Sequence, residues 1–63
     1  MFNVYTEFPS GVRSKGYVRE NREDAQKVFD CMLSQIRTWS SYVVDVVMSE
    51  DGTEVRREHI RNA

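Results

Sequence analysis

The chain of 63 residues contains a single cysteine, Cys31, and a single histidine, His59. One cysteine excludes a disulfide within the chain, and a structural zinc site normally draws on four cysteine or histidine ligands at short spacings. A domain of this length buries only ~60% of the surface that its unfolded chain exposes. Such small domains often need a disulfide, a bound metal or a second subunit for stability. The sequence therefore leaves a well-made core, self-association or a binding partner.

An excess of one charge and a long apolar run are also missing. Nine basic and ten acidic residues give a net charge of −1 at pH 7. Dedicated nucleic-acid-binding domains usually carry a clear basic excess, because phosphate contacts dominate their affinity. No segment approaches the ~20 apolar residues that span a membrane, and the N-terminal residues do not resemble a signal peptide. With one unpaired cysteine, we expect a cytoplasmic protein that does not enter a membrane.

The N-terminal third of the chain predicts a β-hairpin. Residues 2–8 alternate apolar and polar side chains with the period of two that is typical of a strand with one buried face. Pro9, Ser10 and Gly11 suit a three-residue loop with Gly11 in the left-handed conformation, followed by a strand over about 12–19. The expected pairs are Phe8 with Val12, Glu7 with Arg13, Tyr5 with Lys15, Val4 with Gly16 and Phe2 with Val18.

The middle of the chain predicts an amphipathic helix. Asn21 is a suitable N-cap, and Glu23 and Asp24 lie in the first turn, where acidic side chains interact favourably with the helix dipole. Apolar residues then recur at spacings of three and four, which indicates one buried helix face. Trp39 extends this stripe, and the helix is expected to fade over 38–41. The stripe consists of Ala25, Val28, Phe29, Met32, Leu33 and Ile36.

The last third predicts a second hairpin. Residues 42–48 are rich in β-branched side chains, and Asp51-Gly52 is a strong signal for a two-residue loop. The strand that follows is charged, as suits an exposed sheet edge. One of the resulting pairs sets Asp45 against Glu58, two acids. The expected pairs are Met48 with Val55, Val47 with Arg56, Val46 with Arg57, Asp45 with Glu58, Val44 with His59 and Val43 with Ile60.

These elements predict an α+β fold, with residues 1–63 forming a single compact domain of strand, strand, helix, strand and strand. A right-handed crossover from the second strand to the third gives a four-stranded antiparallel sheet of order 2-1-3-4. The helix covers one face of that sheet and leaves the other face open.

The open sheet face is the predicted binding surface. The strand over 42–48 is apolar on both faces except at Asp45, whereas a strand with one face in water should alternate. An exposed apolar surface with a polar rim marks an interaction site, although valine also occurs in strands for its β-propensity alone. We expect a protein partner, either a host protein or a second copy of the chain. The predicted anchors are Tyr5, Tyr17, Val43, Val47 and Ile60, and the predicted rim is Arg13, Arg19 and Arg56.

No catalytic, cofactor or metal site is predicted. Cys31 is expected in the middle of the helix and His59 near the end of the edge strand, each without a second catalytic or ligating group. The three glycines fall in hairpins, so no glycine-rich phosphate loop exists. We therefore expect a protein that is not an enzyme. The alternative function is weak nucleic-acid binding by a basic and aromatic strand face that contains Arg13, Lys15, Tyr17 and Arg19.

The segment from Tyr17 to Phe29, YVRENREDAQKVF, contains a strand that runs into a capped helix beginning with Glu-Asp-Ala. This arrangement resembles very small phage and mobile-element proteins. The layout of the whole chain is similar to phage-encoded inhibitors of host enzymes and anti-defence proteins, which bind and occlude a host surface. The resemblance implies a non-enzymatic, protein-binding role, and it assigns a function to no individual residue.

Overall fold

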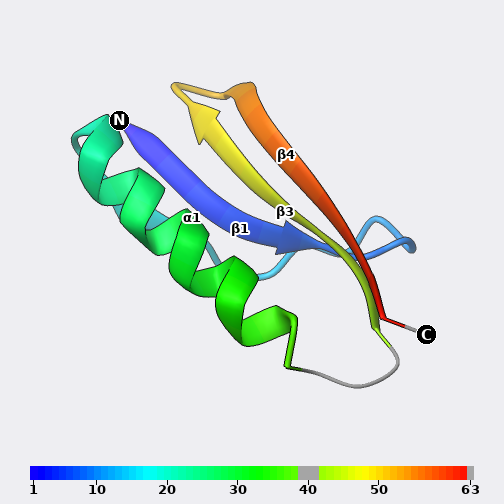
Figure 1. Cartoon of the computed structure of the whole chain (residues 1–63). Helices are drawn as coiled ribbons and strands as arrows, with labels where there is room; N and C mark the ends of the chain where they lie inside the picture. Colours follow the sequence, from blue (N-terminus) through cyan, green and yellow to red (C-terminus); the bar gives the residue numbers. More distant parts are fainter. Residues whose placement is uncertain (39–41, 63) are drawn as a thin grey trace.

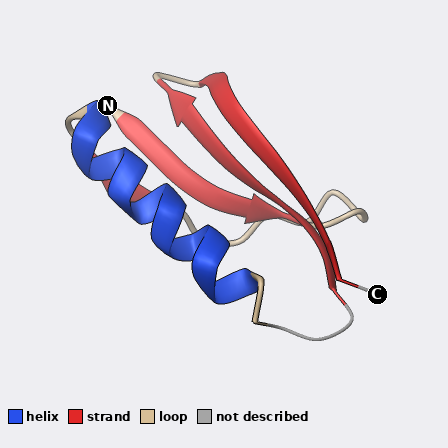
Figure 2. Ribbon diagram, viewed as in Figure 1, coloured by secondary structure: helices blue, strands red, loops and turns tan. Residues whose placement is uncertain are grey.

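The computed structural model describes residues 1–38 and 42–62, so the predicted role of Trp39 lies outside the described residues. Figure 1 shows the order of the elements along the chain. They are β1 (Phe2–Glu7), β2 (Tyr17–Arg19), α1 (Arg22–Ile36), β3 (Tyr42–Glu50) and β4 (Thr53–Asn62). The strands form one antiparallel sheet in the order β2-β1-β3-β4, with α1 packed on one side (Figure 2). The predicted α+β fold and strand order are confirmed.

The helix forms where its apolar period and its cap predict it. The Asn21 side chain accepts a hydrogen bond from the Asp24 backbone N–H at 2.9 Å, which satisfies one of the free donors of the first turn. The last helical residue is Ile36, two residues before the expected fading begins. The helix residues that lie buried against the sheet are Ala25, Phe29, Leu33 and Ile36, and their sheet partners in the core include Phe2, Val4, Val44, Val46, Met48 and Ile60.

The first hairpin has the predicted loop but a shorter second strand. The Phe8 N–H donates to the Val12 carbonyl at 2.8 Å, and Gly11 has a φ of 89°. The predicted pair of Glu7 with Arg13 is also present. Beyond this pair the register changes, because Phe2 lies opposite Arg19 rather than Val18.

The change of register comes from one extra residue on the second segment. Two residues separate Glu7 from Val4 on β1, whereas residues 14–16 separate their partners, Arg13 and Tyr17. Within this stretch, the Thr6 N–H donates to the Ser14 Oγ at 2.9 Å, so a side chain replaces part of the regular backbone pairing. Because of the extra residue, each side chain of β2 lies on the opposite face of the sheet from the one predicted.

The second hairpin also has the predicted turn followed by an extra residue. Asp51 and Gly52 have φ values of 50° and 85°, as a two-residue loop between twisted strands requires. The register then shifts next to Met48, which pairs with Arg56 instead of Val55. Val55 is the additional residue of a β-bulge. The bulge moves Ile60 opposite Val44, in the core, and it moves His59 opposite Asp45 on the open face.

Candidate functional site

The open face of the sheet is apolar at its centre, but this apolar centre is covered. Tyr5 and Val47 lie opposite each other on β1 and β3. Val47 is 0% exposed and Tyr5 is also buried, although both point away from the helix. The Arg13 guanidinium lies 5.3 Å from the centre of the Tyr5 ring, and Arg57 lies opposite Val47. The aliphatic stems of such arginines can cover an apolar surface while the charged ends remain in water.

The cover is organised as an ionic network, which we define as Glu7, Arg13, Asp45, Glu54, Arg57 and His59. Arg57 is its centre. The Arg57 Nη1 donates to Glu7 Oε1 at 3.0 Å and also to Asp45, while Nη2 donates to Glu54 Oε1 at 2.8 Å. Arg13 Nε donates to the other Glu7 oxygen at 2.7 Å. His59 Nδ1 lies 2.6 Å from Asp45 Oδ1.

The ionic network favours the charged forms of its carboxyl groups. Hydrogen bonds from Arg13 and then Arg57 hold the pKa of Glu7 below its ordinary value. The hydrogen bond with His59, followed by that from Arg57, lowers the pKa of Asp45. Arg57 likewise lowers the pKa of Glu54. Because these groups remain in contact with solvent, each pair stabilises the fold only modestly.

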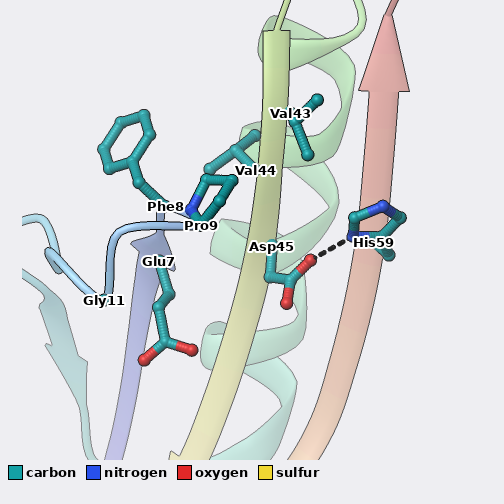
Figure 3. Close-up of a pocket in the computed structure, with 8 residues that line it drawn as sticks. All are labelled: Glu7, Phe8, Pro9, Gly11, Val43, Val44, Asp45 and His59. Carbon is teal, nitrogen blue, oxygen red and sulfur yellow. Dashed lines mark hydrogen bonds and ion pairs between the residues drawn. The ribbon is translucent and has the colours of Figure 1, made fainter.

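An open hollow of about 380 Å³ lies beside the ionic network, between the first hairpin loop and the strands β3 and β4 (Figure 3). Figure 3 shows the Asp45 carboxylate pointing toward His59 across the two strands. An imidazole held by a carboxylate can act as a base when a nucleophile lies beside it. Among the described residues that line the hollow, none is a serine, threonine, cysteine or lysine. The described residues also contain no group of three His, Cys, Asp or Glu able to hold a metal ion.

A second candidate surface lies where β2 meets the helix. Tyr17 is 53% exposed and Val18 is 51% exposed, although both belong to a strand. A groove of about 240 Å³ runs between Tyr17 and Arg19 on β2 and the flank of α1. We name this region the β2 edge surface; it comprises Tyr17, Val18, Arg19, Val28, Cys31 and Met32.

The eight predicted binding residues do not share one face. Tyr5, Arg13, Val43 and Val47 are placed on the open face, as predicted. The other four lie on the helix side of the sheet, because the two extra residues reverse the expected orientation. Those four are Tyr17 and Arg19 at the β2 edge, and Arg56 and Ile60 on β4.

The two β4 residues correct the prediction most clearly. Ile60 is buried in the core and offers no contact to a partner. Arg56 lies with its guanidinium 4.3 Å from the centre of the Phe29 ring, a cation–π contact on the helix side. Arg57, the centre of the ionic network, was not among the residues predicted from the sequence. Its one available signal was the unfavourable pairing of Asp45 with Glu58, which a shift of one residue replaces with Asp45 and His59.

The predicted nucleic-acid face is likewise divided. Arg13 lies on the open face, where it is paired with Glu7, whereas Tyr17 and Arg19 line the groove beside α1. Lys15 lines a neighbouring hollow with Tyr17. Of the four residues predicted to share this face, Lys15, Tyr17 and Arg19 lie together on the helix side, and Arg13 lies on the other side of the sheet.

Comparison with protein-family models, with curated proteins and with solved structures gave no match. Among the described residues, no helix has the length and apolar character needed to cross a membrane.

Proposed function

We propose that this protein is a small, non-enzymatic protein-binding module and that its partner docks on the β2 edge surface. The proposal is carried by one observation: β2 is an edge strand whose three residues are all exposed, including Tyr17 and Val18. An edge strand presents backbone N–H and C=O groups to which an extended segment of another protein can pair. The adjoining groove offers Val28 and Met32 to the side chains of that segment.

The edge is favoured over the open sheet face for a physical reason. Tyr5 and Val47 lie beneath the ionic network, so a partner on that face would have to displace several charge-assisted hydrogen bonds to reach them. Val43 is the one predicted anchor on the open face that remains substantially exposed, at 38%. A single valine offers little apolar area for a partner. At the β2 edge, exposed apolar side chains occur on a strand that, among the described residues, pairs with β1 alone.

The resemblance to phage-encoded inhibitors and anti-defence proteins supports the same class of function. In that role the protein would act by occluding a surface of a host enzyme or defence protein rather than by chemistry. A partner strand along β2 would provide the main-chain hydrogen bonds, and Tyr17 would be the main side-chain anchor, since tyrosine is enriched at binding hot spots.

The test is capture of a partner from bacterial lysate on the tagged chain, followed by calorimetry with the purified partner. Val18→Lys is the interface variant, and Val12→Lys is the matched control, because Val12 is 61% exposed in the first hairpin loop. We expect Val18→Lys to weaken binding at least tenfold and Val12→Lys to leave it unchanged, with both circular dichroism spectra intact. Equal binding by the two variants would exclude the β2 edge.

Weak nucleic-acid binding is a second candidate because Lys15, Tyr17 and Arg19 remain together on one side of β2. Aromatic side chains can stack on bases while basic side chains contact phosphates. Titration with a single-stranded oligonucleotide at low and moderate salt tests this function. Binding that falls steeply with salt and is lost in Tyr17→Ala would favour it. Capture of a protein that survives nuclease treatment would favour the first proposal.

A further inference from the structure

The β2 edge surface has a symmetry property that points to its occupant. We propose that β2 of a second copy of this chain pairs with β2, giving a two-fold dimer with a continuous eight-stranded antiparallel sheet. This inference rests on the proposed function, because it names a second copy of the chain, in place of a host protein, as the partner of the same edge. It follows from which side of the sheet each β2 side chain occupies and from the charges that each possible register brings together.

Symmetry limits the registers that such a dimer can adopt. A two-fold axis perpendicular to the sheet runs the two edge strands antiparallel and keeps both helices on the same side. Directly opposite residues in an antiparallel pair share a face. Tyr17 and Arg19 lie on the helix side, whereas Val18 lies on the open side. The axis must therefore pass through a residue, and the candidates are Tyr17, Val18 and Arg19.

Charge decides between these three positions. An axis at Arg19 sets the two Arg19 side chains opposite each other, and an axis at Tyr17 brings Lys15 of one copy toward Arg19 of the other. Like charges directly opposite in a sheet are destabilising. An axis at Val18 instead sets Tyr17 of each copy against Arg19 of the other. It also pairs the two Val18 side chains on the open face.

The register centred on Val18 is therefore self-complementary. It forms two identical contacts between tyrosine and arginine, a combination that can make a cation–π interaction. Neither Arg19 nor Tyr17 is committed to an ion pair within the described residues, although Arg19 Nη1 donates to the Val18 carbonyl at 2.8 Å. On pairing, the second copy's backbone replaces that bond, which frees the guanidinium to lie over the opposite ring.

The helices leave room for these side chains. The helix α1 contacts β1, β2 and β3, of which β1 is the middle strand. In the proposed dimer the two β1 strands are three strand spacings apart, or about 14 Å. Directly packed helices lie about 8–10 Å apart, so the space between the two α1 helices is wider than direct contact. The Tyr17 and Arg19 side chains of both copies would occupy this space, next to Met32 and the exposed Cys31.

A disulfide at the axis tests the proposal. We would make Val18→Cys in a Cys31→Ser background and compare it with Val12→Cys in the same background. Both valines are exposed, but only Val18 lies on the proposed axis. Opposite residues have Cβ atoms about 4.5–5.5 Å apart, close to the spacing a disulfide needs. We expect the Val18 variant to form covalent dimers at least tenfold faster under mild oxidation. Equal rates for the two variants would overturn the register.

A residue swap provides an independent test with no cysteine chemistry. In sedimentation equilibrium, we expect the unmodified chain to associate weakly and reversibly, because a three-residue strand makes a small interface. Tyr17→Arg should abolish this association, since it sets arginines opposite each other. The double variant Tyr17→Arg/Arg19→Tyr should restore it, because the swap preserves the pair only when the axis lies at Val18.

The two proposals fail in different ways. A chain that sediments as a monomer at every accessible concentration and shows no selective crosslink would exclude the second copy as the occupant. If a captured protein is nevertheless lost with Val18→Lys, the β2 edge remains a binding surface for a different protein. If Val18→Lys also leaves capture unchanged, the proposed function itself is excluded.

Discussion

His59 lies directly opposite Asp45 across β3 and β4, with its Nδ1 2.6 Å from Asp45 Oδ1. This pair exists because the Val55 bulge moves every later residue of β4 by one position against β3. Asp45 is also bound by Arg57, so a single carboxylate joins the histidine to the rest of the ionic network.

We predict that the free energy of unfolding decreases as the pH falls below about 4. The hydrogen bond with His59 and then that from Arg57 lower the pKa of Asp45 in the folded state, and the pKa of Glu7 is lowered by Arg13 and Arg57. The unfolded chain therefore binds protons at a higher pH than the folded chain does. The stabilisation is complete above the ordinary carboxyl pKa of about 4 and is lost as the pH falls through the lowered values.

Urea unfolding between pH 7 and pH 2.5 measures this effect. Asp45→Asn provides the control, since it removes one of the titrating groups and should make the decrease in stability shallower. Arg57→Met should do the same for Glu7, Asp45 and Glu54 together, because Arg57 binds all three. Identical pH profiles for the three proteins would show that the ionic network does not contribute to acid sensitivity.

The buried position of Val47 gives a second prediction. Val47 is 0% exposed, beneath the ionic network, whereas Val43 on the same strand and face is 38% exposed. A lysine in place of Val47 would bury a charge without a partner, which proteins rarely tolerate. We expect Val47→Lys to destabilise the fold by about 3 kcal/mol or more and Val43→Lys by about 0.5 kcal/mol. Thermal melts followed by circular dichroism measure both losses. Similar melting temperatures for the two variants would show that the ionic network does not bury Val47.

The bulge at Val55 gives a third prediction, which uses deletions. Removing Val55 joins Glu54 to Arg56, whose partners Ser49 and Met48 are already adjacent, so every remaining pair between β3 and β4 is preserved. We expect this deletion to cost about 1 kcal/mol, because a partly exposed valine is lost and the ladder becomes regular.

Deletion of Glu58 is the matched control for the bulge. It moves Ile60 one position along β3, away from Val44 and onto the open face. Losing a buried isoleucine from a core costs about 2–5 kcal/mol. We therefore expect this variant to unfold at a much lower urea concentration than the Val55 deletion. Equal losses in the two variants would show that Val55 does not form a bulge in solution.

The two extra residues, one within 14–16 and one at Val55, mark the limit of what the sequence could predict. The helix has an Asn21 cap and a sustained apolar period, and both hairpin turns carry glycine where φ is positive, at Gly11 and Gly52. These local signals predicted the elements, and the right-handed crossover rule then predicted the strand order. Register is different, because inserting one residue reverses every later side chain. Both insertions fall in largely polar stretches, 14–16 and 54–58. In these stretches no alternation of apolar and polar residues shows which side of the sheet each side chain occupies.

The candidate site was predicted less well for the same reason. Tyr17 and Arg19 were assigned to the open face and lie on the helix side, and Ile60 was assigned to a partner and lies in the core. The cover over Tyr5 and Val47 was not predictable from periodicity. It depends on Arg57 contacting Glu7, which lies fifty positions away in the chain.

The close approach of Gly16 to Asn3 gives the last prediction. A Cβ atom at Gly16 would lie 1.9 Å from Asn3 Oδ1, so any side chain at position 16 must displace the asparagine. The Asn3 Oδ1 atom is itself buried without a hydrogen-bond partner among the described residues. Removing such a group can be neutral or stabilising, because no hydrogen bond is lost.

We expect Gly16→Ala alone to cost about 1–3 kcal/mol, the usual range for overpacking. Asn3→Ala alone should change stability by less than about 0.5 kcal/mol. The double variant should recover most of the loss, which a double-mutant cycle of urea midpoints measures as coupling between the two positions. Additive effects would show that Asn3 is not what limits the size of the residue at position 16.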